Sequence, residues 1–376
     1  MAQQPDAIVV GGGIVGAACA RELARGGLSV TLIEADFIGG GATAAGMGHI
    51  VVMDDSPAQF ALTALSRSLL DALAPELTAG VERDRCGTLW VAEDDAQLDS
   101  AREKQIAYAA AGIEAALLDA DELRRVEPEL RPDLAGGMLV PGDGVVYPPV
   151  LARWLADDAR ASGAVVLEHQ PVERLDGRSV MTAGGRLDAG IVVNAAGAAA
   201  PGLMPGLPIV PRRGHLVITD RHPGFCRHQV LELGYLQSAH SLTGASVAFN
   251  VQPRVTGQVL IGSSRELVGW DRSPSRSILT RMLERAAAFM PRLAALSVLR
   301  SWIGFRPATA DKLPLIGRWP ATDGLWIAAG HEGLGITTAL GTARLLGDLM
   351  LGRPPSLDPV PFDPARVLES AGATGG

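Results

Sequence analysis

Cysteine is scarce in this chain of 376 residues, and its three cysteines form no recognisable site. Cys19, Cys86 and Cys226 lie far apart and show no CxxC or CxH spacing, so we predict neither a metal site nor a disulfide framework. Free thiols are typical of a reducing compartment. We therefore expect a cytoplasmic protein, with peripheral contact at the inner membrane as the alternative.

Long apolar runs and basic runs are also missing. No uncharged apolar run reaches the ~18 residues that a membrane-spanning helix needs. The first residues, MAQQPDAIVV, have no basic segment of the kind that opens a signal peptide. Lys and Arg form no cluster and the net charge is −8, which together argue against a nucleic-acid partner. The length suits one large domain or two interleaved ones.

Strands and helices alternate at the beginning, in the middle and at the end of the chain. A buried strand in DAIVVGG, a helix in GIVGAACARELARGG and a strand in LSVTLIEAD form a compact βαβ pattern. The alternation of helices and strands resumes after residue 145. A helix begins there at two prolines and is followed by a strand in AVVLEHQPVERL and a strand in AGIVVNAAG. The alternation closes with a strand in GLWIAAG and a helix in ITTALGTARLLGDLML.

The segments between these repeats predict a second kind of architecture. The runs GHLVITD, SVAFNVQP and QVLIGSS are strand-like and are joined by Gly and Pro turns, which is typical of an antiparallel sheet. We predict the α/β class: a Rossmann-type, glutathione-reductase-like domain with an inserted antiparallel-sheet α+β domain. The first domain is expected at 1–84, 145–212 and 303–376, and the second at 85–144 and 213–302. The final ESAGATGG is expected to be a disordered tail.

The first glycine-rich turn has the spacing of a dinucleotide-binding site. Gly11 permits a tight turn, Gly13 lets backbone N–H groups approach a pyrophosphate, and Gly16 lets helix and strand pack closely. The diphosphate would lie at the positive end of the helix. Glu34 ends the second strand, where a carboxylate can accept hydrogen bonds from ribose hydroxyls. A purely structural turn is the alternative, and the pattern does not separate NAD from FAD.

Four further segments resemble the D-amino-acid oxidase-like flavoproteins in order and spacing: GGGATAAGMGHI, VVNAAGAAAPGL, WIGFRPATADKLPLIG and AAGHEGLGITTALG. The resemblance extends over nearly the whole chain and is closest to the D-hydroxyproline dehydrogenase and glycine oxidase-like members. It implies FAD, held noncovalently because none of the three cysteines lies near the position where sarcosine oxidases attach the flavin. Taken singly, the small residues would indicate only helix–sheet packing. The implied cofactor contacts are Gly11, Gly13, Ile14, Val15, Gly16, Glu34, Ala35, Ala42, Thr43, Ala44, Ala45, Gly46, Met47, Val172, Ala195, Ala196, Gly197, Arg306, Leu334, Gly335, Ile336 and Thr337.

The resemblance also implies oxidation of a C–N bond to an imine, which then hydrolyses. Arg306, in GFRP, matches the arginine that grips the substrate carboxylate with two parallel hydrogen bonds; a structural ion pair is the alternative. Asn250 stands where glycine oxidase-like members carry a tyrosine, and it shares a strand face with Gln252. These two side chains contact either the ligand or only the sheet. The missing tyrosine counts against glycine and sarcosine as substrates.

Two histidines and a glutamate complete the candidates. His49 follows the segment that would line the flavin and could contact a substrate hydroxyl, although a lone histidine is more often structural. In the last glycine turn, where relatives carry an arginine, His331 and Glu332 either touch the ligand or shape the loop. The helix beginning near Ile336 would present its positive end to the flavin. The substrate-side candidates are Arg306, His49, Met47, Asn250, Gln252, His331 and Glu332.

These features predict an FAD-dependent dehydrogenase or oxidase of a D-amino acid or cyclic secondary amino acid, with D-hydroxyproline or D-proline preferred. The alternative is a glycine or sarcosine oxidase, or the flavin subunit of an opine oxidase or a cyanide-forming complex. An NAD-dependent dehydrogenase would leave GFRP unexplained, and a flavin-binding scaffold would leave Arg306 unexplained. The expected partners are a small amino-acid substrate, an electron acceptor (a quinone, an electron-transfer protein or O2), and either small partner subunits or further copies of the chain.

Overall fold

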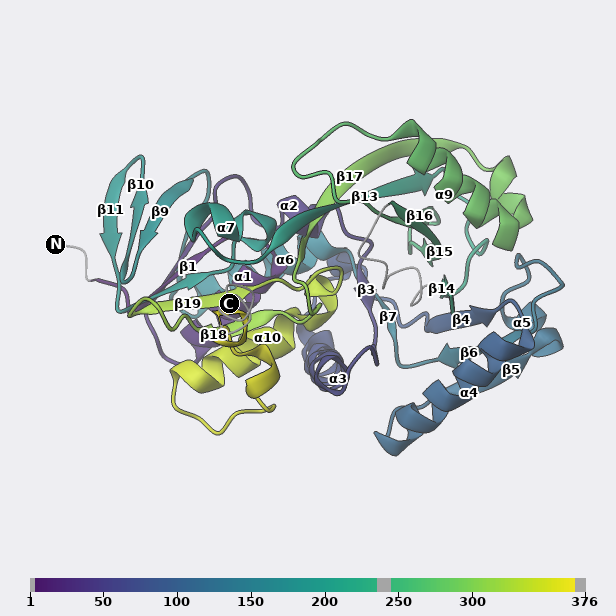
Figure 1. The fold of residues 1–376 in the computed structure, drawn as a ribbon, viewed down its shortest axis with the longest axis horizontal. Coiled ribbons are helices and arrows are strands. Elements are labelled where there is room, and N and C mark those ends of the chain that lie inside the picture. The colour runs from purple at the N-terminus through teal and green to yellow at the C-terminus, as the bar shows by residue number, and fades with distance from the viewer. Residues whose placement is uncertain (1–3, 235–244, 369–376) are drawn as a thin grey trace, which may run out of the picture.

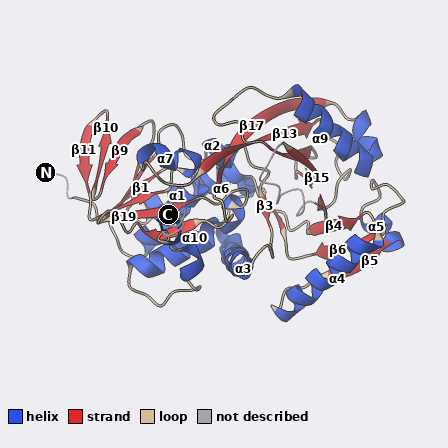
Figure 2. Ribbon diagram, in the orientation of Figure 1, coloured by secondary structure: helices blue, strands red, loops and turns tan. Residues whose placement is uncertain are grey.

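Two large sheets organise the molecule, as the computed structural model shows for residues 4–234 and 245–368 (Figure 1). The tail predicted at 369–376 lies outside the described residues. Helices gather around the first sheet, whereas the second sheet carries its helices on its outer side (Figure 2). No helix in the described ranges is both long and apolar enough to cross a membrane.

The first sheet has six strands in the order β18-β19-β12-β1-β2-β8. The strands from β19 to β8 run parallel, and β18 is antiparallel to β19. Because these strands come from the beginning, middle and end of the chain, this layer is discontinuous in sequence. The strands are β1 (Ala7–Val10), β2 (Val30–Ile33), β8 (Val165–Leu167), β12 (Ile191–Asn194), β18 (Leu315–Arg318) and β19 (Leu325–Ala329).

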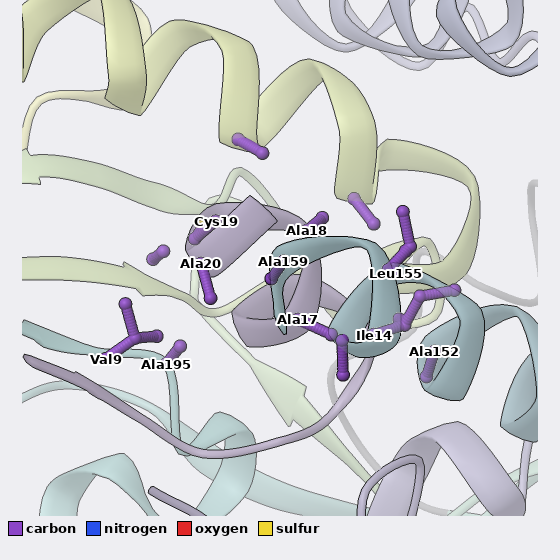
Figure 3. Close-up of a cluster of buried hydrophobic side chains, with 14 of the residues drawn as sticks. Val9, Ile14, Ala17, Ala18, Cys19, Ala20, Ala152, Leu155, Ala159 and Ala195 are labelled. Atoms are coloured by element: carbon purple, nitrogen blue, oxygen red, sulfur yellow. The ribbon is translucent and has the colours of Figure 1, made fainter. Parts of the chain in front are cut away.

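Helix α1 is packed between two other helices of this layer, α6 and α10, and α10 also packs on α3. Alanines on α1 and α6 let the helices approach closely, and Figure 3 shows Ala17, Ala18 and Ala159 in the resulting core. Ser56 caps α3 by accepting from the Gln59 N–H. The helices are α1 (Ile14–Arg25), α3 (Pro57–Leu73), α6 (Pro148–Ala161) and α10 (Gly335–Met350), with short α2 (Gly41–Ala44) and α7 (Ala200–Leu203).

A small antiparallel sheet, β11-β10-β9, stands at the end of this layer (Figure 1). Its strands are β9 (Val172–Asp176), β10 (Ser179–Thr182) and β11 (Gly185–Asp188). The single strand predicted in AVVLEHQPVERL is therefore wrong: the segment divides into β8 and β9, which belong to different sheets. His169 lies between them in the left-handed region (φ 57°), so the chain changes direction there.

The second sheet has eight strands in the order β17-β13-β16-β15-β14-β4-β6-β5. All neighbours are antiparallel except β14 and β4, which run parallel. Helices α4, α5 and α9 pack against it. The strands are β4 (Thr88–Ala92), β5 (Ala116–Asp119), β6 (Gly136–Val140), β13 (Val210–Thr219), β14 (Gln229–Glu232), β15 (Ser246–Pro253), β16 (Val259–Arg265) and β17 (Val298–Ala308); the helices are α4 (Asp95–Ala110), α5 (Ala120–Val126) and α9 (Arg276–Phe289).

Two long strands, β13 and β17, cross the predicted domain boundaries at 212/213 and 302/303. They pair along their length and extend between the two parts of the molecule (Figure 1). The division into an FAD-binding and a substrate-binding domain stays a prediction, and these paired strands would form its connection. The strands β3 (His49–Ile50) and β7 (Gly144–Val145) form a separate two-stranded antiparallel ribbon.

Candidate active site

A cavity of about 1000 Å³ is lined by residues of both large sheets. Its wall combines the two glycine-rich turns, the segment after β2, and the strands β13, β15, β16 and β17. The structure thus brings together most of the residues that the sequence predicts for the site. The predicted residues on this wall are Gly11, Gly13, Ile14, Val15, Glu34, Ala35, Ala42, Thr43, Ala45, Gly46, Met47, His49, Val172, Ala195, Ala196, Gly197, Asn250, Arg306, His331, Glu332, Gly335 and Ile336.

The first turn lies so close to its surroundings that two of its positions require glycine. Gly11 has a φ of 107°, and a Cβ there would lie 2.6 Å from the carbonyl oxygen of Ala195. A Cβ on Gly16 would lie 1.8 Å from the carbonyl oxygen of Gly11. Gly16 therefore does not line the cavity; it lets α1 pack directly on the turn.

The N-terminus of α1 begins at the cavity wall. Its N-cap, Gly13, offers no side chain to the first N–H groups, and Thr43 Oγ1 accepts one hydrogen bond from the Ile14 N–H at 3.0 Å. Glu34 accepts hydrogen bonds from the N–H groups of Gly12 (2.5 Å) and Asp36 (2.9 Å). A helix N-terminus with a carboxylate beside it at the end of β2 is the arrangement that holds a diphosphate and a ribose.

The N-terminus of α10 reaches the same cavity from the other end of the chain. A Cβ on Gly335 would lie 3.8 Å from Val15, so α10 and α1 begin close together. Ile336 packs against Gly46, whose Cβ would lie 2.4 Å from Ile336 Cδ1. Three other predicted contacts are not on the cavity wall. Ala44 is exposed, Leu334 packs against an apolar core, and Thr337 donates a hydrogen bond to the His49 carbonyl at 2.8 Å.

Arg306 lies on β17 with its guanidinium held at the cavity wall. Its Nη1 donates to the carbonyl oxygen of Ser264 at 2.9 Å. The guanidinium packs over Gly214, where a Cβ would lie only 2.3 Å from Nη1, and against Gly333 of the last turn. Arg306 is therefore fixed by β13, β16 and the turn before α10 together.

His331 and Glu332 occupy the bend between β19 and α10. His331 is 4% exposed, its Nε2 lies 3.0 Å from Thr342 Oγ1, and burial lowers its pKa to about 3, so the ring is neutral near pH 7. Glu332 adopts a left-handed backbone with a φ of 48°. Burial alone would raise the pKa of Glu332, but the charges of Arg265, Arg306 and Arg212 hold that pKa below its ordinary value.

Three buried polar atoms of residues that line the cavity have no hydrogen-bond partner within residues 4–234 and 245–368. They are Asn250 Oδ1, Ser263 Oγ and His49 Nε2, and all three residues line the cavity. Asn250 and Ser263 are 3% and 2% exposed, and burial lowers the pKa of His49 to about 4. Gln252, on the same strand face, does not line the cavity; it donates a hydrogen bond to the Met47 carbonyl at 2.6 Å. Asn250 thus lines the cavity, whereas Gln252 is bonded to the backbone of Met47.

Several residues on the wall were missed by the sequence reasoning. They include Gly214, Ser263, Trp270 and Phe305. A glycine inside a strand often marks a close approach of another group, so Gly214 carried a usable signal. The ring centroids of Trp270 and Phe305 are 5.0 Å apart. Trp270 lies in an irregular segment, where no periodic pattern points to it.

Comparison with known proteins identifies the family. Residues 6–349 match the DAO family, described as FAD dependent oxidoreductase, and the chain belongs to it. A glycine oxidase of Pseudomonas aeruginosa is 32% identical over 380 residues, covering 96% of this chain and 99% of the relative. A D-amino acid dehydrogenase of Xanthobacter autotrophicus is 32% identical over 330 residues, covering 83% of this chain and 74% of the relative. The crystal structure of L-proline dehydrogenase from P. horikoshii has a TM-score of 0.88 at 26% identity, covering 98% of this chain and 99% of that chain.

The predicted family, fold class and cofactor are therefore confirmed: the protein is an FAD-dependent oxidoreductase that acts on amino acids or amines. The cavity fits this cofactor. Two helix N-termini whose N-cap residues make no side-chain hydrogen bond converge on it, and the glycines at 11 and 13 leave the backbone bare. Gly13 and Ile14 would hold the diphosphate, Glu34 the ribose, and Gly335 and Ile336 the flavin end. Noncovalent attachment stays a prediction.

Proposed function

We propose that the protein oxidises the C–N bond of a D-amino acid or cyclic secondary amino acid, with D-hydroxyproline or D-proline preferred. The observation that supports this is the lining of the cavity: it holds Arg306 and three buried polar atoms that lack partners in the described part of the chain. Buried polar atoms are normally hydrogen-bonded. Glycine has no side-chain group that could reach them, whereas a ring hydroxyl supplies both a donor and an acceptor.

Arg306 would fix the substrate through its carboxylate. A guanidinium offers two parallel N–H donors, and the hydrogen bond to Ser264 holds it at the cavity wall. When bound, FAD supplies the hydride acceptor for the hydrogen on the carbon next to the amine, and the imine product hydrolyses in water. The contribution of the protein is chiefly orientation, since two-point binding of a substrate sets the position of the reacting carbon.

The other polar side chains would bind rather than exchange protons. His49 and His331 are neutral near pH 7 because burial lowers the pKa of each. Glu332 is ionised, but its lowered pKa makes it a weak base. Asn250 Oδ1 can accept a hydrogen bond from the substrate amine or hydroxyl, and His49 and Ser263 can complete the contacts of a hydroxyl.

A glycine- or sarcosine-type oxidase is the second candidate. It is favoured by the glycine oxidase relative, which matches nearly the full length of both chains. It leaves the buried polar atoms at Asn250 and Ser263 without a function. For either candidate, the electron acceptor is proposed to be a quinone, an electron-transfer protein or O2. Small partner subunits, as in an opine oxidase- or cyanide synthase-like complex, belong to the same proposal.

Anaerobic bleaching of the holoenzyme tests the substrate. The panel contains D- and L-hydroxyproline isomers, D-proline, other D-amino acids, glycine and sarcosine, and the readout is the rate at which flavin absorbance is lost. We expect the D-cyclic compounds to bleach the flavin fastest. Faster bleaching by glycine or sarcosine would overturn this choice in favour of the second candidate. For either candidate, a second assay in air identifies the electron acceptor. Hydrogen peroxide formed at the turnover rate would mark an oxidase, and turnover only with a dye or quinone would mark a dehydrogenase.

A further inference from the structure

The carboxylate of Glu332 separates the cavity from two buried arginines. Glu332 lines the cavity, whereas Arg212 on β13 and Arg265 at the end of β16 do not. Arg212 Nη1 lies 3.2 Å from Glu332 Oε1, and Arg265 Nε lies 3.9 Å from the same atom. Each arginine is only 5% exposed. The side chain of Glu332 therefore stands between these guanidinium groups and any ligand beside Arg306.

The backbone holds Glu332 in this place. Its N–H donates to the carbonyl oxygen of Pro307, the residue after Arg306, at 2.8 Å. The left-handed conformation at Glu332 turns the chain so that the next residue, Gly333, packs against the Arg306 side chain. The same turn therefore places the Glu332 carboxylate beside Arg212 and Arg265 and brings Gly333 into contact with Arg306.

The charges around Glu332 favour an anion at this point. Arg212 and Arg306 are directly opposite each other in the β13–β17 pair, and like charges in that position repel. Buried guanidinium groups also need hydrogen-bond acceptors, because their desolvation is costly when they are not paired. Glu332 supplies one such acceptor from within the chain, and the arginines around it lower its pKa and so keep it ionised.

We propose that Glu332 acts as a built-in carboxylate that excludes a second substrate carboxylate, so that the site selects amino acids with one carboxylate over acidic ones. The inference rests on the proposed function, in which Arg306 binds the first carboxylate. An acidic amino acid would bring its second carboxylate toward Arg212 and Arg265 only by displacing that of Glu332. Removing the Glu332 side chain would open the arginine pair to the cavity and convert a barrier into a subsite.

Thermal unfolding of the holoenzyme with simple anions tests this without turnover. Wild type, Glu332→Ala and Glu332→Gln are compared in acetate, malonate and sodium chloride at equal ionic strength. Because a ligand that binds only the folded state raises the melting temperature, malonate is expected to raise that of Glu332→Ala by a few degrees more than that of wild type. Acetate is expected to stabilise Glu332→Ala more than chloride does, by occupying the vacated carboxylate position.

Glu232→Gln is the matched control. Glu232 is a buried carboxylate, 4% exposed, paired with Arg285, and neither residue lines the cavity. This variant should lose stability without gaining any response to malonate. If Glu332→Ala does not fold, Glu332→Gly replaces it, since glycine also removes the side chain and suits the left-handed backbone at this position. A malonate response of that variant no larger than the response of wild type overturns the proposal.

Substrate preference gives the second readout. The ratio of flavin bleaching by D-glutamate or D-aspartate to bleaching by D-proline should rise at least tenfold in Glu332→Ala. An unchanged ratio alongside normal wild-type activity would sink the inference and leave the proposed function intact. Failure of wild type to oxidise any member of the panel would sink the proposed function, and the anion experiment would still decide the role of Glu332.

Discussion

Gly214 and Arg306 are in direct contact across the β13–β17 pair. A Cβ at position 214 would lie 2.3 Å from Nη1 and 2.8 Å from Cζ of Arg306, which leaves no room for a side chain there unless the guanidinium moves. The bare backbone of Gly214 and the Ser264 carbonyl together fix the guanidinium at the cavity wall. The position of the arginine is thus set by the absence of a neighbouring side chain as much as by the hydrogen bond it makes.

Gly214→Ala should move Arg306 without unfolding the protein. The clash falls on the far end of a flexible side chain, which can shift at small cost, so the fold is expected to tolerate the methyl group. Misplacement of a substrate-orienting group by about 1 Å can cost ~100-fold in rate. We expect a rise in KM and a fall in kcat/KM for amino acids, with FAD content unchanged. Steady-state kinetics and flavin absorbance after gel filtration measure both effects.

Gly202→Ala is the control for this variant. Gly202 also lines the cavity, but a Cβ there would have no heavy atom within 4 Å. It should leave the kinetics close to wild type. Equal losses in the two variants would mean that crowding of the cavity, and not displacement of Arg306, causes the effect.

Replacing Arg306 itself separates substrate binding from cofactor binding. Arg306→Ala should lower kcat/KM by roughly 100-fold or more, because it removes two charge-assisted hydrogen bonds worth about 1.5–3 kcal/mol each. Arg306→Lys keeps the charge but loses the two-pronged geometry, so it should recover only part of the loss. FAD content is measured from the absorbance of the released flavin. A variant that loses FAD would show that Arg306 is a structural or cofactor-holding residue.

Two glycines of the first turn should respond differently to the same substitution. Gly13 has an extended backbone (φ −64°), and the nearest atom to a Cβ there, Thr43 Oγ1, is 3.3 Å away, so Gly13→Ala should fold. Its methyl group would stand at the N-terminus of α1, where the diphosphate is expected, and should weaken FAD binding. Gly16→Ala would place a Cβ 1.8 Å from the Gly11 carbonyl and should destabilise the fold itself. Flavin titration and urea unfolding measure these two outcomes.

Each of these two variants serves as the control for the other. Gly13→Ala is expected to change the dissociation constant of FAD far more than the unfolding midpoint of the apoprotein, and Gly16→Ala the reverse. Identical behaviour of the two variants would contradict the geometry of the turn.

The sequence predicted best what depends on short-range backbone geometry. Gly11 and Gly16 were identified because a tight turn followed by a helix leaves few alternatives at those positions. Strand β15 was predicted with its bounds, since SVAFNVQP is bounded by turn residues. The same reasoning could not decide between Asn250 and Gln252. They share a strand face, and only the position of Met47, more than two hundred residues away, makes one a cavity residue and the other a support.

Other contacts between segments far apart in the sequence could not be predicted either. The sequence marks Glu332 as a difference from related proteins. Its arginine partners lie on β13 and β16, and they depend on how these strands pair, which the sequence pattern does not reveal. The small sheet β9–β11 was missed because all three strands are short, and β9 and β11 are mostly exposed, so they lack the apolar alternation by which strands are recognised.

His331 should make the protein lose stability in acid. Burial lowers its pKa to about 3 in the folded state, whereas the unfolded chain has the ordinary value near 6.5. Between those values the unfolded state binds more protons, so stability falls as pH decreases from about 6.5. At pH 5 this contribution is about 2 kcal/mol, at 1.36 kcal/mol per pKa unit. His331→Gln can still hydrogen-bond Thr342 but cannot titrate, so the stability gap between wild type and variant should shrink by about that amount from pH 7 to pH 5. Urea unfolding of the holoenzymes, followed by circular dichroism, measures the gap; parallel pH curves for the two proteins would show that His331 takes up its proton equally well in the folded and unfolded states.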